Sequence, residues 1–250
     1  MKLIIKETSE MGALAAAQAA KVVNEAIEEQ GYARILLSTG ASQFPFFSEF
    51  VKQDIDWSKV EMFHLDEYVG ISEDHPASFK RYLLDRFVNI VKPGKVHLIE
   101  GQKAPEETIA ELTALVNEKP IDLGMIGIGE NGHIAFNDPP ADFDTEEAYL
   151  VVDLDDVCRK QQLGEGWFPT FDDVPKQAIS MSVRQIMKSA CIINTVPDAR
   201  KAYAVRITIE GELCPAHPAS VIRLHPDCHT FCDKDSAADL SPLAKDLCSK

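Results

Sequence analysis

A single histidine, His133, lies within the glycine-rich stretch GIGENGHIAFNDPP at residues 127–140. This stretch follows the apolar run at residues 121–126, which predicts a buried strand. Glycines let the backbone turn sharply and come close to a ligand, and histidine is the side chain best suited to proton transfer near pH 7. Asp138 can orient the imidazole ring and favour its charged form. The stretch therefore predicts a histidine–carboxylate pair at the mouth of a site.

A pair of adjacent carboxylates, Asp66 and Glu67, follows a second apolar run at residues 60–65. Taken alone, such a pair is better explained as a helix cap or a solvated loop. In a site it provides a base at the end of a strand, where partial burial raises the carboxyl pKa toward neutrality. The pair is therefore a candidate general base.

A small, hydroxyl-rich turn follows a third apolar run at residues 33–37 and leads into a helix predicted to begin near Phe44. Backbone N–H groups at a helix start, with hydroxyls beside them, can hold a phosphate. The turn lacks the lysine of a P-loop and the spacing of a dinucleotide fingerprint, so an ordinary strand–helix turn explains it equally well. Its residues are Ser38, Thr39, Gly40, Ala41 and Ser42.

Together, the three segments predict acid–base chemistry on a small phosphorylated substrate. No Ser, His and Asp fall into a recognisable hydrolase pattern, and no dinucleotide motif occurs. One cluster resembles a metal site: His225, Cys228, His229 and Cys232 lie close together. Its spacing is irregular for zinc, and a strand would send His229 and Cys232 to opposite faces. A short buried strand ending at Asp233 is the favoured interpretation, and no metal site is expected.

Apolar strand-like runs alternate with segments of helical periodicity along most of the chain, which predicts an α/β fold with an open, mostly parallel sheet and helices on both faces. Ligands of such folds bind beyond the carboxyl ends of the strands. The pattern loosens between residues 140 and 175, which predicts a flap over the site within one domain spanning residues 1–250. Strands are expected at 3–5, 33–37, 60–64, 96–99, 121–128, 178–182, 191–196 and 229–232. Helices are expected at 13–29 with a stop at Gly31, from Pro76 onward, and at 106–118, 183–188 and 198–210.

The composition excludes several classes of partner. The 250 residues carry a formal net charge of −15 and are 45% hydrophobic. Phosphodiester backbones and anionic lipid would repel such a chain, so neither nucleic acid nor a membrane is an expected partner. No stretch reaches the roughly 20 apolar residues of a membrane span, and the N-terminus does not resemble a signal peptide. The six cysteines are therefore expected to be reduced thiols in a cytoplasmic protein.

The segments FHLDEYVGISEDHPASF and GIGENGHIAFNDPP resemble the glucosamine-6-phosphate deaminase (isomerase) family, which is related to 6-phosphogluconolactonase. STGAS, DDVPKQAISMSV, ARKAYAV and HPDCHTFCD fall where that family has its corresponding segments, so the resemblance covers nearly the whole chain. It implies a Rossmann-like domain and a cofactor-free conversion of an amino-sugar 6-phosphate to a ketose 6-phosphate and ammonia. Relatives are often oligomeric, which leaves a homo-oligomer open for this chain.

The resemblance also implies roles for individual residues. Asp66 would move a proton between C2 and C1 during enolisation, and His133 would open the pyranose ring by handling the proton at the ring oxygen. Asp138 would support His133. The turn at residues 38–42 and Lys201 would hold the phosphate, because a lysine ammonium is a point charge that can reach a dianion. Two further residues would lie beside the substrate: Glu67 and Gly132.

The chain departs from the family pattern at three positions. Asn131 stands where deaminases usually have an aspartate in the histidine's relay, and an amide supplies neither a base nor a negative charge. Asp138 is one methylene shorter than the usual glutamate. Gly166 stands near the position of the family's phosphate-binding arginine, which Arg159 or Lys160 would have to replace.

These departures leave the sugar open between glucosamine 6-phosphate and an epimer such as galactosamine 6-phosphate. Two other functions also stay open: a 6-phosphogluconolactonase-like hydrolase and a non-catalytic sugar-phosphate sensor.

Overall fold

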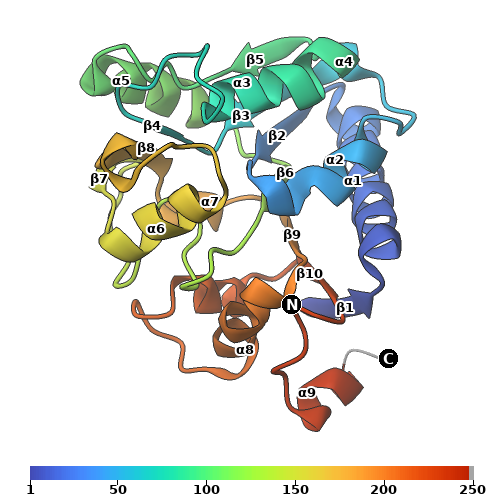
Figure 1. Cartoon of the computed structure of the whole chain (residues 1–250). Coiled ribbons are helices and arrows are strands. Elements are labelled where there is room, and N and C mark those ends of the chain that lie inside the picture. The colour runs from blue at the N-terminus through green and yellow to red at the C-terminus, as the bar shows by residue number, and fades with distance from the viewer. Residues whose placement is uncertain (248–250) are drawn as a thin grey trace.

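Seven strands form the main sheet, and every neighbouring pair in it runs parallel. The strand order is β1-β10-β9-β6-β2-β3-β5 (Figure 1). This computed structural model describes residues 1–247. The predicted open, mostly parallel sheet is confirmed. Its strands are β1 (Lys2–Lys6), β2 (Ala33–Leu37), β3 (Val60–His64), β5 (Lys95–His97), β6 (Leu123–Ile126), β9 (Cys191–Val196) and β10 (Cys228–Asp233).

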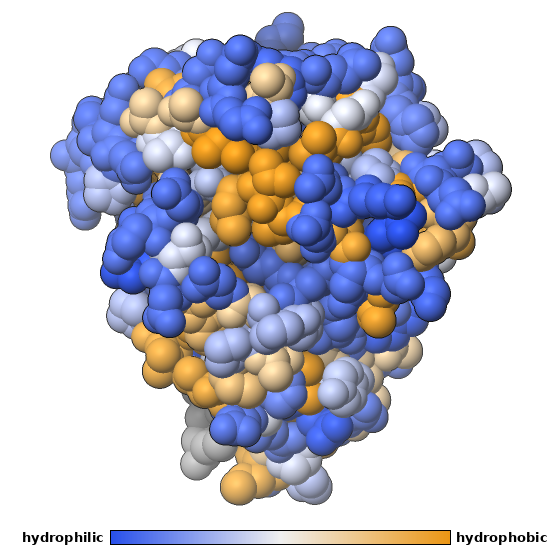
Figure 2. All heavy atoms as spheres, turned by 90° about the vertical axis from the view of Figure 1, so that its left-hand side faces the viewer, coloured by the Kyte–Doolittle hydropathy of each residue, from blue (hydrophilic) through white to orange (hydrophobic). Residues whose placement is uncertain are grey.

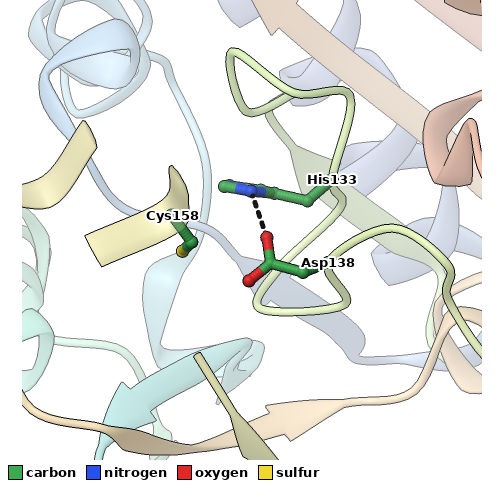
Figure 3. Close-up of side chains that lie close together, drawn as sticks. All are labelled: His133, Asp138 and Cys158. Atoms are coloured by element: carbon green, nitrogen blue, oxygen red, sulfur yellow. Dashed lines mark hydrogen bonds and ion pairs between the residues drawn. The ribbon is translucent and has the colours of Figure 1, made fainter. Parts of the chain in front are cut away.

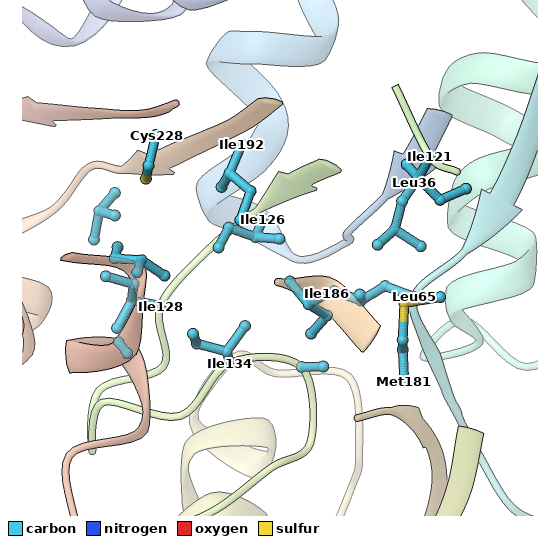
Figure 4. Packing of buried hydrophobic residues seen from close by; sticks show 14 of the residues in the cluster. Leu36, Leu65, Ile121, Ile126, Ile128, Ile134, Met181, Ile186, Ile192 and Cys228 are labelled. Carbon is cyan, nitrogen blue, oxygen red and sulfur yellow. The ribbon is translucent and has the colours of Figure 1, made fainter. Parts of the chain in front are cut away.

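Helices cover both faces of this sheet, as the alternation of strands and helices predicted. Side chains of the central strands alternate between the two faces, so Leu36 belongs to one apolar cluster while Ile35 and Leu37 belong to the other. On the first face Leu36, Ile126 and Ile192 pack together (Figure 4). The described helices are α1 (Thr8–Gln30), α2 (Phe44–Phe50), α3 (Phe79–Leu83), α4 (Asn89–Val91), α5 (Pro105–Val116), α6 (Asp156–Gly164), α7 (Val183–Ile186), α8 (Ala202–Glu210) and α9 (Pro242–Leu247).

Small residues let α1 approach its neighbours closely. A Cβ added at Gly12 would lie 2.4 Å from the carbonyl oxygen of Pro45, which immediately follows the first residue of α2. Buried alanines of α1, among them Ala15 and Ala19, belong to the same apolar cluster as the α2 phenylalanines. Gly31 ends the helix in a left-handed conformation with φ of 86°, as the sequence predicted. This contact sets where α2, and the turn before it, lie.

A second, antiparallel sheet of three strands packs beside the main sheet. It contains β4 (Asp66–Tyr68), β8 (Gln177–Met181) and β7 (Tyr149–Asp153), in that order. The strand predicted at residues 178–182 is β8, and it belongs to this smaller sheet. The region at residues 140–175 also contains more regular structure than a loose flap, since it holds β7 and α6. Side chains of α6 pack against the β4 residue Tyr68 in a third apolar cluster.

Several predicted element boundaries need correction. The helix expected from Pro76 begins at Phe79, because Ser78 is its N-cap and accepts a hydrogen bond from the Arg81 N–H. The strand expected at 121–128 is limited to β6, and the carboxylate pair expected at a strand tip lies within β4. The helix expected at 198–210 is α8 preceded by the short 3-10 turn Ala199–Lys201.

The surface agrees with the polar composition. On the side of the molecule that carries β7 and α6, hydrophilic residues cover much of the surface, with a broad apolar patch near the centre of the view and smaller apolar areas below it (Figure 2). Within the described residues, no helix combines the length and the apolar character needed to cross a bilayer.

Candidate active site

One cavity lies where the chain reverses its direction of travel across the main sheet. From β2 the chain proceeds outward to β3 and β5, and it then returns to β6 on the other side of β2. Parallel sheets bind ligands at the carboxyl ends of the strands flanking such a point. The turn after β2 and the loop after β6 both line the cavity. Asp66, His133 and Lys201, which are remote from one another in the sequence, line it as well.

His133 forms a hydrogen-bonded pair with Asp138. Nδ1 of His133 lies 3.0 Å from Oδ1 of Asp138, and both side chains are 9% exposed (Figure 3). Burial opposes ionisation of Asp138, but hydrogen bonds from His133 and Asn131 outweigh it and hold the carboxyl pKa below its ordinary value. Because an ionised carboxylate only accepts hydrogen bonds, Nδ1 of His133 carries the hydrogen, and Nε2 is the nitrogen free to exchange protons.

Asn131 connects both members of this pair. Its Nδ2 donates to Oδ1 of Asp138 at 3.0 Å, and its Oδ1 accepts from the backbone N–H of His133 at 3.0 Å. The amide therefore fixes the loop and contributes a donor to Asp138, where an aspartate would add a second negative charge. The loop itself requires glycine: a Cβ at Gly129 would lie 2.2 Å from Nε2 of His133, and Gly132 has φ of 88°.

Asp66 and Glu67 are both buried but differ in their hydrogen bonding. The Glu67 carboxylate accepts from the Tyr68 N–H, the Ser78 hydroxyl and the Lys80 N–H at 2.7–2.9 Å. Within the described part of the chain, no hydrogen bond reaches the Asp66 carboxyl. Burial, followed by the neighbouring charge of Glu67, raises the pKa of Asp66 to about 8. Asp66 is therefore a carboxyl poised to exchange a proton near neutral pH.

The hydroxyl-rich turn lies at the other end of the cavity. Ser38, Thr39, Gly40 and Ser42 line it, while Ala41 faces away into neighbouring surface hollows. The Ser38 hydroxyl is buried and has no hydrogen-bond partner, which leaves it available to a ligand. Gly40 has φ of 99°, a conformation that favours glycine. Lys201 is 6% exposed, and its side chain also lines the cavity.

The site residues expected from the sequence thus divide into two groups. Asp66, His133 and Lys201 line the cavity together with four residues of the turn, whereas the other five do not line it. Those five are Ala41, Glu67, Asn131, Gly132 and Asp138.

Known proteins resemble this chain along most of its length. A family model described as glucosamine-6-phosphate isomerases/6-phosphogluconolactonase matches residues 6–230. The chain belongs to this family. A glucosamine-6-phosphate deaminase from Streptococcus sanguinis SK36 is 36% identical over 221 residues, covering 86% of this chain and 92% of its own. A protein of the same name from Lactobacillus delbrueckii subsp. bulgaricus is 32% identical over 238 residues, covering 94% of this chain and 97% of its own.

Solved structures of the family have the same fold. A monomeric glucosamine-6-phosphate deaminase has a TM-score of 0.87 at 29% identity, with 96% of this chain and 100% of that chain covered. A putative 6-phosphogluconolactonase from Neisseria gonorrhoeae FA 1090 has a TM-score of 0.75 at 20% identity, with 93% and 99% covered. The second likeness shows the fold alone.

Arg159 and Lys160, the two cations that the resemblance offered in place of an arginine at Gly166, do not line the cavity. Arg159 is buried, and its guanidinium donates to the carbonyl oxygens of Phe171 and Val174, away from the cavity. Lys160 is exposed on α6 and does not line the cavity. The wall contains Glu165 instead, and its charge acts on Lys201. Neither Arg159 nor Lys160 therefore reaches the cavity to take the place of an arginine at Gly166.

Three further residues at or beside the cavity lie on α6 and were not predicted from the sequence. Gln162 lines the cavity and accepts a hydrogen bond from the Tyr68 hydroxyl at 2.7 Å, and Gln161 accepts one from the Glu130 N–H at 3.0 Å.

Cys158 lies beside Asp138 (Figure 3). Burial, followed by the charge of Asp138, raises the pKa of the Cys158 thiol far above its ordinary value. The N-cap Asp155, which accepts from the Cys158 N–H at 2.6 Å, was the available signal for this helix.

Proposed function

We propose that this chain converts an amino-sugar 6-phosphate to a ketose 6-phosphate and ammonia, with glucosamine 6-phosphate as the substrate and galactosamine 6-phosphate as the alternative epimer. The observation that carries the proposal is one cavity bounded by a buried carboxyl of raised pKa, a histidine–carboxylate pair and a hydroxyl-rich turn with a lysine. The family and the names of its relatives support the same activity.

The first step of the proposed reaction opens the sugar ring at His133. Nε2 of the protonated imidazole delivers a proton to the ring oxygen as the C1–O bond to that oxygen breaks and the C1 hydroxyl releases its own proton to solvent water, which produces the open-chain aldehyde. Asp138 stabilises the imidazolium through the Nδ1 hydrogen bond. Asn131 holds the loop and the Asp138 carboxylate in register for this transfer.

The second step transfers a proton from C2 to C1 through Asp66. The Asp66 carboxylate takes the proton from C2 to form an enolamine and returns it to C1, which leaves an iminium at C2. Water then adds to C2 and ammonia leaves, giving the ketose. A carboxyl whose pKa is about 8 suits this role, because proton transfer is most efficient when the pKa of the base lies near the working pH. Glu67 supports that pKa by its adjacent charge.

The phosphate binds at the hydroxyl-rich turn in this proposal. The backbone N–H groups and hydroxyls of Ser38, Thr39 and Ser42 hold its oxygens, and Gly40 lets the backbone approach. Lys201 provides the cation. Glu165 opposes phosphate binding by its negative charge, so it lowers affinity for a fully ionised phosphate. Ala41 and Gly132 contribute through the backbone geometry of their loops.

The proposal extends to the setting of the reaction. The chain acts as one domain over residues 1–250, in the cytoplasm and without a cofactor. Its partner is the phosphorylated amino sugar, with neither nucleic acid nor a membrane involved. The net charge of −15 supports the exclusion of these polyanionic partners.

A substrate panel tests the activity. The purified chain is assayed for ammonia with glucosamine 6-phosphate, galactosamine 6-phosphate and unphosphorylated glucosamine, and for acid release with 6-phosphogluconolactone. We expect ammonia from a 6-phosphate and none from glucosamine. Acid release from the lactone without ammonia would replace the proposal with a lactonase, and binding without any turnover would replace it with a sensor.

A further inference from the structure

A second group of reactive side chains lies at the opposite end of the main sheet from the cavity. Cys191 is the first residue of β9, and Asp227 immediately precedes β10. The two strands pair in parallel, and the Ile192 N–H donates to the Asp227 carbonyl oxygen at 2.9 Å, which brings Asp227 next to Cys191. The active-site cavity lies at the carboxyl ends of the strands, so this amino-terminal group is separate from it.

Three different ligand types converge at this place. Asp227 and His229 are two residues apart, so their side chains lie on the same face of the strand. Nε2 of His229 is 2.9 Å from Oδ1 of Asp227. The Cys191 sulfur, a His229 ring nitrogen and an Asp227 carboxylate oxygen all lie within 4.8 Å of one another. Cys191 and His229 are buried, whereas the Asp227 side chain is 49% exposed.

In the structure, the four residues of the histidine–cysteine cluster noted in the sequence do not form one group. Cys228 and Cys232 belong to the apolar cluster on one face of the sheet, and Cys191 belongs to the cluster on the other. Nε2 of His225 donates to the Ser189 carbonyl oxygen, and its Nδ1 accepts from the Asp227 N–H. Only His229 of the original four is therefore part of the new group, and its partners come from outside the motif.

We propose that Cys191, Asp227 and His229 form a binding site for one Zn²⁺ ion, with water as the fourth ligand. Thiolate, imidazole and carboxylate are the three protein ligands of zinc, and a thiolate disfavours magnesium and calcium. Around a tetrahedral zinc, donor atoms lie roughly 3.3–3.8 Å apart, so small side-chain rotations complete the geometry. The exposure of Asp227 leaves access for the water.

Zinc binding at this site is accompanied by the release of a proton. The Cys191 thiol gives its proton to solvent as the sulfur–zinc bond forms, and the imidazole binds in its neutral form. Lys2 pairs with His229 in the strand register, and its positive charge acts on Cys191 and Asp227. This charge opposes every cation, so only ions that gain strongly from a thiolate overcome it. Zinc would then link the start of β9 to the start of β10.

Cobalt provides a direct test because Co²⁺ occupies zinc sites and absorbs strongly in the near ultraviolet when a thiolate binds it. Chelator-treated protein is titrated with Co²⁺ and then with Zn²⁺. We expect a thiolate–cobalt band that saturates at one ion per chain and disappears as zinc displaces the cobalt. The absence of a thiolate band would overturn the proposal.

Matched variants locate the site. A second described group, His133, Asp138 and Cys158, also has donor atoms within 4.8 Å of one another, and it lies beside the catalytic cavity, which His133 lines. We expect Cys191→Ser to lose the band and His229→Gln to weaken cobalt binding at least tenfold, whereas Cys228→Ser and Cys158→Ser keep both. A band lost in Cys158→Ser and kept in Cys191→Ser would assign the metal to the catalytic group and overturn the proposal.

Thermal unfolding gives an independent readout that does not depend on catalysis. A ligand that binds only the folded state raises the unfolding midpoint. Zinc should therefore raise the midpoint of the parent and of Cys158→Ser, and raise that of His229→Gln by less. His229→Gln covers the case in which the buried Cys191→Ser variant fails to fold. An equal zinc-induced rise in parent and His229→Gln would contradict the site.

Discussion

Replacing Asp66 by asparagine should make the protein more stable at alkaline pH while removing its activity. In the unfolded chain this carboxyl ionises near its ordinary pKa of 3.8, whereas in the folded protein burial and the charge of Glu67 raise the pKa to about 8. The raised pKa stabilises the folded parent fully only below pH ~4, and this stability is lost as the pH rises toward 8. Asparagine has a similar shape and does not titrate, so Asp66→Asn avoids that loss.

The expected gain follows from the proton linkage. Each pH unit between the two pKa values costs the parent up to about 1.4 kcal/mol, so three units, from pH 5 to pH 8, set an upper limit of about 4 kcal/mol. Burial raises the pKa of Glu67 as well, to about 7, and part of the pH dependence therefore belongs to Glu67 and remains in the variant. We expect Asp66→Asn to gain about 2 kcal/mol over the parent across this range.

Urea unfolding at pH 5, 6.5 and 8 measures this difference, with the ammonia assay and binding of a phosphorylated inhibitor run on the same samples. Asp239→Asn is the matched control, because Asp239 is exposed and distant in sequence from the site. We expect the control to follow the parent. A stability difference between Asp66→Asn and the parent that stays constant from pH 5 to pH 8 would refute the account of the raised pKa.

Three other substitutions test the remaining parts of the site. His133→Gln should slow the closed-ring substrate about 10²-fold more than the open-chain form, and equal slowing would remove the ring-opening role. Asn131→Asp adds a negative charge beside the His133–Asp138 pair and should move the alkaline limb of the pH–rate profile, where the proton donor for ring opening is lost, to higher pH; an unchanged profile would place Asn131 outside the relay. Glu165→Gln removes a negative charge facing the phosphate and should lower KM severalfold with little change in kcat, whereas a higher KM would contradict its position in the phosphate end of the cavity.

The bounds of two largely buried strands could be predicted from the sequence. The bounds of β2 and β3 match their predicted ranges residue for residue, because both strands are apolar runs in the centre of a parallel sheet. The convergence of Asp66 and His133 was also predictable, since the carboxyl ends of parallel strands meet at one edge. Neither inference required knowledge of long-range packing.

The missed elements are those that depend on such packing. The residues of β7 vary from buried to exposed, and the strand lies at the edge of its sheet, where it pairs with β8. Its sequence therefore gives only a weak indication of a strand. The helix α6 is largely polar and gains its position from contacts of Cys158 and Leu163 with the third apolar cluster. The placement of Gln162 and Glu165 in the cavity follows from that docking, so it could not be deduced from local sequence.

The central claim is that Asp66 acts as the proton-transfer base of an amino-sugar-phosphate deaminase. Ammonia release from glucosamine 6-phosphate, measured side by side for the parent and Asp66→Asn, tests it most directly. The account predicts steady release by the parent and a loss of at least about 10³-fold in the variant, with inhibitor binding retained. No release by the parent with either epimer, or equal release by both proteins, would contradict it.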